Sequence, residues 1–178
     1  MLEALNASVS LTGLIWLGLV MFVIHDLEEI IWIKAIRSKG KAHVLNRIPK
    51  PLVSMFDRLL DTTSAQFAVA VLLETLILTV VTFAAAEKGW YLGYLAFMTI
   101  FLLHVFTHIG QTILLRMYTP GVVTALLVVF PFTSYTLYRI VASSPVTTHD
   151  VLISIPFGFL IVPVVLIGHA IGKKVALP

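Results

Sequence analysis

The feature that most constrains this chain is a run of ionisable residues inside an apolar segment. Residues 25–29 read His-Asp-Leu-Glu-Glu, with apolar residues at 14–24 before them and at 30–33 after them. An ionisable group at bilayer depth costs about 2.5–3.5 kcal/mol on insertion scales, so such groups usually face a partner, a cavity or an ion. The rest of the sequence should therefore supply a compensating partner for this segment.

The composition is that of an integral membrane protein. Of 178 residues, 59% are hydrophobic and 12% are charged, and the mean hydropathy is +1.01. The length suits a single helical domain over residues 1–178. The chain has no cysteine, which excludes disulfides, thiolate metal sites and cysteine nucleophiles. Any metal ion must therefore be held by imidazole and carboxylate groups.

Five apolar segments are long enough to cross the hydrocarbon layer, which requires about 20 residues each. Backbone polar groups in lipid must be satisfied within the segment, which favours helices over open sheets. The N-terminus lacks the basic region of a cleavable signal peptide, so we expect the first segment to be retained. The sequence predicts an all-α bundle of five transmembrane helices near residues 10–33, 63–86, 90–115, 120–141 and 150–172.

The distribution of basic residues predicts the orientation of this bundle. Seven lysine and arginine residues lie in the loop 34–62, and Arg116, Lys173 and Lys174 fall on the same side. The positive-inside rule then gives an external N-terminus, a cytoplasmic C-terminus and a cytoplasmic loop 34–62, in an inner (cytoplasmic) membrane. The net charge of +3 is explained by this topology, and no nucleic-acid partner is predicted.

Polar residues recur on single faces of the predicted spans. His25, Glu28 and Glu29 fall within about a 100° arc of the first helix. His104 and His108 form an i,i+4 pair on the third helix. Glu74 lies in the second span and His169 in the fifth. Counting about 1.5 Å per residue from the cytoplasmic edge places these residues at depths of roughly 6–20 Å.

A common depth for residues from four helices favours one shared site, and imidazole with carboxylate suits zinc or iron. Helical bundles build such sites from inward-facing pairs on neighbouring helices. There are more candidate ligands than one tetrahedral ion needs, so the site is either dinuclear or mononuclear with a general-base carboxylate. The predicted ligands are His25, Glu29, His104, His108 and His169, while Glu28 and Glu74 are further ligands, bridging groups or the catalytic base.

Each of these residues also has a structural interpretation. A single histidine in a membrane helix, such as His169, often makes an interhelical hydrogen bond. Glu74 could be a protonated carboxyl group bonded to Gln66 or to a backbone carbonyl. Glu29 is preferred to Glu28 as the ligand because its spacing from His25 repeats the spacing of the histidine pair. Three residues are left open as members of the site, namely Asp26, Gln66 and Gln111.

The fifth span is interrupted by Pro156, Gly158 and Pro163. Proline inside a helix frees backbone carbonyls and bends the axis. The plain interpretation is a packing kink. The functional interpretation is a lateral opening for a lipid-like molecule beside His169.

The pentapeptide His25-Asp-Leu-Glu28-Glu29 resembles the motif that names the HXXEE family of small multi-span membrane proteins. The resemblance covers this motif, its place in an apolar N-terminal helix, and the size and hydropathy of the chain. The family has no assigned function, so the resemblance implies a membrane fold and no mechanism.

The sequence favours an intramembrane metal-dependent enzyme that acts on a membrane lipid or another apolar substrate. With zinc, the expected reaction is hydrolysis by a metal-activated water. With iron, the same ligands would suit hydroxylation or desaturation. Two further alternatives are a metal-free lipid isomerase that works by acid–base chemistry and an ion or proton transporter. The transporter is disfavoured because the polar residues form one layer and no inverted repeat is present.

Overall fold

The computed structural model describes residues 6–35 and 40–176, and within these ranges every regular element is a helix. Arg37 and Lys39 of the predicted basic loop lie outside the described residues. In chain order the elements are α2 (Leu11–Ala35), α3 (Lys41–Leu45), the 3-10 turn η2 (Lys50–Leu52), α4 (Val53–Leu60), α5 (Ser64–Lys88), α6 (Tyr91–Leu115), α7 (Val122–Thr124), the π-helical turn η3 (Ala125–Val129), α8 (Phe130–Ser143), α9 (Thr148–Gly158) and α10 (Ile161–Val175).

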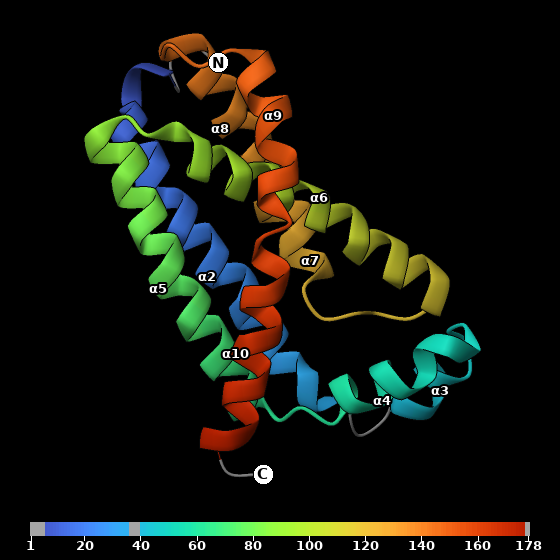
Figure 1. Ribbon diagram of the computed structural model, residues 1–178. Coiled ribbons are helices and arrows are strands. Elements are labelled where there is room, and N and C mark those ends of the chain that lie inside the picture. Colours follow the sequence, from blue (N-terminus) through green and yellow to red (C-terminus); the bar gives the residue numbers. More distant parts are fainter. Residues whose placement is uncertain (1–5, 36–39, 177–178) are drawn as a thin grey trace.

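Four of the described segments are long and apolar enough to cross a membrane: Ser64–Lys88, Tyr91–Leu115, Val122–Ser143 and Thr148–Val175. They match four of the predicted spans and support a membrane protein. The remaining predicted span corresponds to α2, which has 25 residues and lies along α5. The count of five crossings and the orientation of the termini stay predictions. In Figure 1, α3, α4 and the end of α10 lie at one end of the bundle, and α2 begins at the other.

The long α5 helix has well-defined ends. At its start, Thr63 and Gln66 form a capping box, in which each side chain bonds the backbone N–H of the other. This arrangement satisfies amide groups that have no partner inside the helix. At its end, Gly89 adopts a left-handed conformation with φ +69°, which glycine tolerates without steric cost. Gln66 therefore bonds the backbone of Thr63 through this capping box, and no described hydrogen bond joins it to Glu74.

The last span is broken into two helices that follow different neighbours. Pro156 lies inside α9, and the helix restarts at Ile161 as α10. α9 packs on α6, whereas α10 packs on α5 (Figure 1). The predicted interruption is therefore confirmed. At the α5–α10 contact, Gly168 and Gly172 bring the two backbones close together, as small residues do in membrane helix pairs.

The crossing of α2 and α6 positions the polar residues. Tyr94 is fully buried and donates a hydrogen bond of 3.0 Å to the carbonyl oxygen of Ile15. Gly18 leaves room for the Tyr94 ring, since a Cβ there would overlap its hydroxyl oxygen. Further along the same contact, Phe22 meets Phe97 with ring centroids 6.0 Å apart. His25, one turn beyond Phe22, is thereby brought against α6.

The glycines give a test of this packing. A Cβ on Gly172 would overlap the Gln66 carbonyl oxygen, so Gly172→Ala should push α10 away from α5. We expect a loss of about 1–3 kcal/mol of stability, which is typical of overpacking. A Cβ on Gly110 would meet no described atom within 4 Å, so Gly110→Ala should be neutral or stabilising by about 0.5–1 kcal/mol. Thermal unfolding in a nonionic detergent would measure both changes, and equal destabilisation would contradict the packing.

Candidate metal centre

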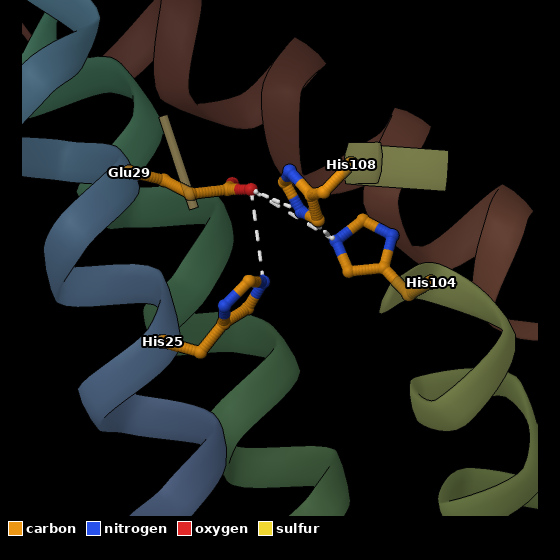
Figure 2. Close-up of side chains that lie close together, drawn as sticks. All are labelled: His25, Glu29, His104 and His108. Carbon is orange, nitrogen blue, oxygen red and sulfur yellow. Dashed lines mark hydrogen bonds and ion pairs between the residues drawn. The ribbon is translucent and has the colours of Figure 1, made fainter. Parts of the chain in front are cut away.

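Four side chains from α2 and α6 converge on one point (Figure 2). One carboxylate oxygen of Glu29, Oε1, lies 3.0 Å from Nε2 of His108 and 3.8 Å from Nε2 of His25 and of His104. The Nε2 atoms of His104 and His108 are 2.8 Å apart. The four potential ligand atoms all lie within 4.8 Å of one another. This group of residues, His25, Glu29, His104 and His108, is called the His3Glu cluster below.

The spacing of the His3Glu cluster fits a single transition-metal ion. Zinc–nitrogen and zinc–oxygen bonds are about 2.0–2.2 Å long, so ligand atoms around a tetrahedral zinc are separated by about 3.3 Å. The observed separations of 2.8–3.8 Å around Glu29 and the histidine pair bracket that value. His25 and His108 are 1% and 3% exposed. The His3Glu cluster could therefore hold a metal ion with small movements of its side chains.

The other ring nitrogens of two histidines are held by hydroxyl groups. Nδ1 of His25 lies 2.9 Å from Oγ1 of Thr124, and Nδ1 of His104 lies 3.2 Å from Oγ1 of Thr107. Each threonine hydroxyl donates to a backbone carbonyl, at Gly121 and at His104 respectively, so it is free to accept from the imidazole N–H. A proton on Nδ1 leaves the Nε2 lone pair facing the cluster, as a metal ligand requires. Consistently, Nε2 of His25 is buried and has no hydrogen-bond partner among the described residues.

Glu28 points away from this centre and toward the start of α7. Its carboxylate accepts hydrogen bonds from the Tyr118 hydroxyl at 2.5 Å and from the backbone N–H of Thr124 at 2.7 Å and Val123 at 3.4 Å. Burial and the hydrogen bond to Glu28 raise the pKa of Tyr118. Glu28 therefore anchors the segment 118–124, and that segment carries the threonine that orients His25.

Gly121 lies directly against the cluster. It has a φ of +86°, and a Cβ at this position would lie 2.5 Å from Cε1 of His108 and 2.8 Å from Oε1 of Glu29. Any side chain would therefore displace a ligand, and only glycine combines this close approach with a left-handed backbone. The π-helical turn η3 begins soon afterwards at Ala125, and such turns are frequent at functional sites.

Two cavities meet at the His3Glu cluster, and Glu29 and His104 line both of them. The inner cavity, of about 160 Å³, has walls of phenylalanine and aliphatic side chains and also exposes Asp26 and Glu74. The outer cavity, of about 460 Å³, reaches His169 and Gln111 and extends to Phe56 and Leu60 of α4. The cluster therefore stands at the junction of a small acidic pocket and a larger apolar one.

α3 and α4 form part of the wall of the outer cavity. Val44 of α3 is buried. Nε2 of the neighbouring His43 lies 2.7 Å from the carbonyl oxygen of Leu115, at the end of α6. Lys41 forms ion pairs with Asp57 at 2.8 Å and Asp61 at 2.6 Å, which tie α3 to α4 and to the residue after it. Hydrogen bonds to these two carboxylates raise the pKa of Lys41. His43, a loop residue in sequence, thus links this wall to the end of α6.

The predicted site residues are distributed among these places. The structure brings His25, Glu29, His104 and His108 together. Glu74 and His169 lie in the walls of the adjoining cavities, outside the His3Glu cluster, and Glu28 faces α7. Their predicted roles as ligands or catalytic groups stay predictions. Sequence reasoning missed three positions that shape the site, Thr107, Gly121 and Thr124; the only available signal was the Pro-Gly turn at 120–121.

Comparison with known proteins agrees with the motif in α2. A family model described as "Protein of unknown function with HXXEE motif" matches residues 16–136, which is more than half of the chain. The chain belongs to the HXXEE family. The matched range includes the whole His3Glu cluster, Glu28 and Glu74, whereas His169 lies beyond it. In this HXXEE protein the three named positions are His25, Glu28 and Glu29.

A curated relative has similar length. The "Uncharacterized protein YrkK" of Bacillus subtilis (strain 168) is 23% identical over 161 residues, covering 86% of this chain and 91% of that protein. No solved structure matches this HXXEE protein.

Removing the histidine pair tests whether the cluster binds metal. We expect purified protein, prepared without chelators, to contain about one equivalent of zinc or iron, as a single four-ligand centre would hold. The double variant His104→Ala, His108→Ala should lose it, because two of four ligands are removed. His149→Ala is the matched control, since His149 is exposed at the start of α9. Elemental analysis gives the readout, and full metal content in the double variant would contradict the site.

The two motif glutamates should behave differently. Glu29→Gln removes the only carboxylate of the cluster and should abolish metal binding. Glu28→Ala keeps all four ligands but releases the α7 segment, so we expect metal affinity to fall by about 10–100-fold, as for residues that orient ligands. Competition with a chromogenic chelator would measure both affinities. Equal losses for the two variants would contradict the separation of roles.

Proposed function

We propose that this protein is an intramembrane metal-dependent enzyme that hydrolyses a lipid or another apolar substrate. The observation that carries the proposal is the position of the His3Glu cluster. It lies among apolar helices at the junction of two cavities, and Glu29 and His104 contribute to the walls of both. A purely structural metal site would not need cavities that reach its ligands.

The four cluster residues would hold the ion, and zinc or iron fits their donor atoms. When bound, such an ion supplies Lewis acidity and lowers the pKa of a coordinated water. The exposure of the four side chains indicates from which side water or substrate could reach a bound ion. His25 and His108 are buried, Glu29 is 17% exposed and His104 is 44% exposed. Water or substrate would therefore approach from the side of Glu29 and His104.

Two acid–base groups lie close to this centre without belonging to it. Glu74 of α5 is buried and lines the inner cavity. His169 of α10 lines the outer cavity, and its Nδ1 atom is buried without a hydrogen-bond partner in the described part of the chain. Hydrolysis needs a group that takes a proton from water and returns it to the leaving group. We assign this role to Glu74, with His169 as the group that contacts substrate from the outer cavity.

The walls of the cavities suit an apolar substrate. Phe22, Phe97 and Phe101 face the inner cavity, while Phe56, Leu60 and Leu166 face the outer one. Ligand pockets of this kind place a few polar groups in a mainly apolar lining. A substrate with a hydrocarbon chain would lie in the outer cavity, which is the larger of the two, with its polar part at the cluster.

An iron-dependent oxidoreductase is the second candidate, because three imidazoles and a carboxylate would leave two open positions in the octahedral coordination that iron accepts. The metal found in purified protein decides between the two. Zinc would favour hydrolysis, and iron with oxygen-dependent turnover would favour oxidation.

The hydrolase is tested with variants of two glutamates. Glu74→Gln should lower the turnover of lipid esters or amides by about 10²–10⁴-fold, the usual contribution of a general base, and leave the metal content unchanged. Glu87→Gln is the matched control, because Glu87 bonds Trp16 at the far end of α5. Product release from a panel of lipid esters and amides in detergent gives the readout. Metal-free wild-type protein that is fully folded would overturn the proposal.

A further inference from the structure

The inner cavity contains two acidic groups besides Glu29, and neither forms an ion pair with a described lysine, arginine or histidine. Asp26 and Glu74 are 7% and 8% exposed and, with Glu29, contribute three carboxyl groups to its lining. Oδ2 of Asp26 is buried and has no hydrogen-bond partner in residues 6–35 and 40–176. A buried carboxyl oxygen without a donor is costly, and proteins normally provide one. The described protein atoms do not provide it, so the donor comes from a molecule in the cavity, either water or a ligand.

The charge of the cavity indicates what kind of ligand this is. Among the described residues that line the two cavities there is no lysine or arginine. A molecule bound here would therefore meet carboxyl oxygens from Asp26, Glu29 and Glu74 and no side-chain ammonium or guanidinium group of the described lining. A phosphate or carboxylate head group would lack a lysine or arginine partner in this cavity, whereas a cationic donor could make charge-assisted hydrogen bonds to the carboxyl oxygens.

An organic cation and a metal ion differ in the carboxyl separations that they can join. Asp26 and Glu74 do not belong to the set of described side chains whose ligand atoms lie within 4.8 Å of one another. Metal–oxygen bonds of about 2.0–2.2 Å cannot join carboxylates that are further apart than about 4.4 Å. Charge-assisted hydrogen bonds from an ammonium group are about 2.7–2.9 Å long and join oxygens up to about 5.8 Å apart. Asp26 and Glu74 are therefore not placed on the same ion as the His3Glu cluster, and an ammonium group could bond both carboxyls over a wider range of separations than a metal ion.

We propose that the inner cavity binds the ammonium group of an amphiphilic amine, held by Asp26 and Glu74 beside the metal centre. The hydrocarbon chain of the amphiphile extends into the outer cavity past Glu29 and His104, which both cavities share. This inference rests on the proposed function, and it narrows the substrate to an amine-bearing lipid or its amide. In hydrolysis of an amide, water adds its hydroxyl to the carbonyl carbon, the C–N bond breaks, and the leaving nitrogen takes a proton to become the amine.

Binding of single-chain amphiphiles to the metal-loaded protein tests the inference. The probes are decylamine, decanol and decanoate at equal mole fraction in a nonionic detergent, with thermal unfolding and calorimetry as readouts. We expect decylamine to bind at least about tenfold more tightly than decanol, because charge-assisted hydrogen bonds are stronger than neutral ones. Decanoate should not stabilise the protein. Equal binding of decanol, or tighter binding of decanoate, would overturn the proposal.

Variants connect this binding to the acidic groups. Asp26→Asn and Glu74→Gln should each reduce decylamine binding to the level of decanol, and Glu87→Gln should leave it unchanged. If Asp26→Asn does not fold, Glu74→Gln alone carries the test. Metal content is measured on every sample. A second equivalent of metal that both variants lose would overturn the amine in favour of a dinuclear site. Metal-loaded protein without selective amine binding refutes this inference alone, whereas metal-free folded protein refutes the proposed enzyme.

Discussion

The contact between Glu29 and three imidazoles is the interaction on which the rest of the structure depends. A carboxylate among apolar helices is stable only with donors or cations around it, and here Oε1 of Glu29 lies within 3.8 Å of three Nε2 atoms. That contact joins α2 to α6. The packing around it is arranged accordingly, because Tyr94 fixes the helix crossing and Gly121 leaves space for both Glu29 and His108. The contact between Glu29 and the imidazoles therefore both provides partners for a buried carboxylate and holds α2 against α6.

The HXXEE motif gives its three named residues two different tasks. His25 and Glu29 are one turn apart and face the cluster, while Glu28 faces sideways to the start of α7. A carboxylate at a helix N-terminus accepts backbone N–H groups that have no partner inside the helix. Through Thr124 this support reaches the ring of His25. The motif thus supplies two candidate ligands, His25 and Glu29, and a third residue, Glu28, that holds the segment orienting the ring of His25.

Helix positions and the spacing of the residue pairs in the cluster were accessible from the sequence because both follow from local patterns. Apolar runs set the spans, and four of them agree with the described helices within three residues. The i,i+4 spacing identified His104 and His108, and Pro156 with Gly158 marked the break in the last span. The placement of Glu74 and His169 was not accessible. Common depth in a bilayer constrains only one coordinate, and the rotation and separation of the helices decide whether two side chains touch.

The sequence by itself determined the all-helical membrane composition, the residue types available to a metal, and the i,i+4 spacings of His25 with Glu29 and of His104 with His108. These follow from hydropathy and from the helical period, which act within one segment. Only the tertiary structure decided which candidate ligands meet, that Glu28 binds α7, and that Asp26 and Glu74 line a cavity beside the cluster without belonging to it. The physical reason is that such contacts depend on the angles at which the helices cross. A few close approaches set these angles, such as Gly18 on Tyr94 and Gly172 on Gln66. No local sequence pattern specifies these approaches.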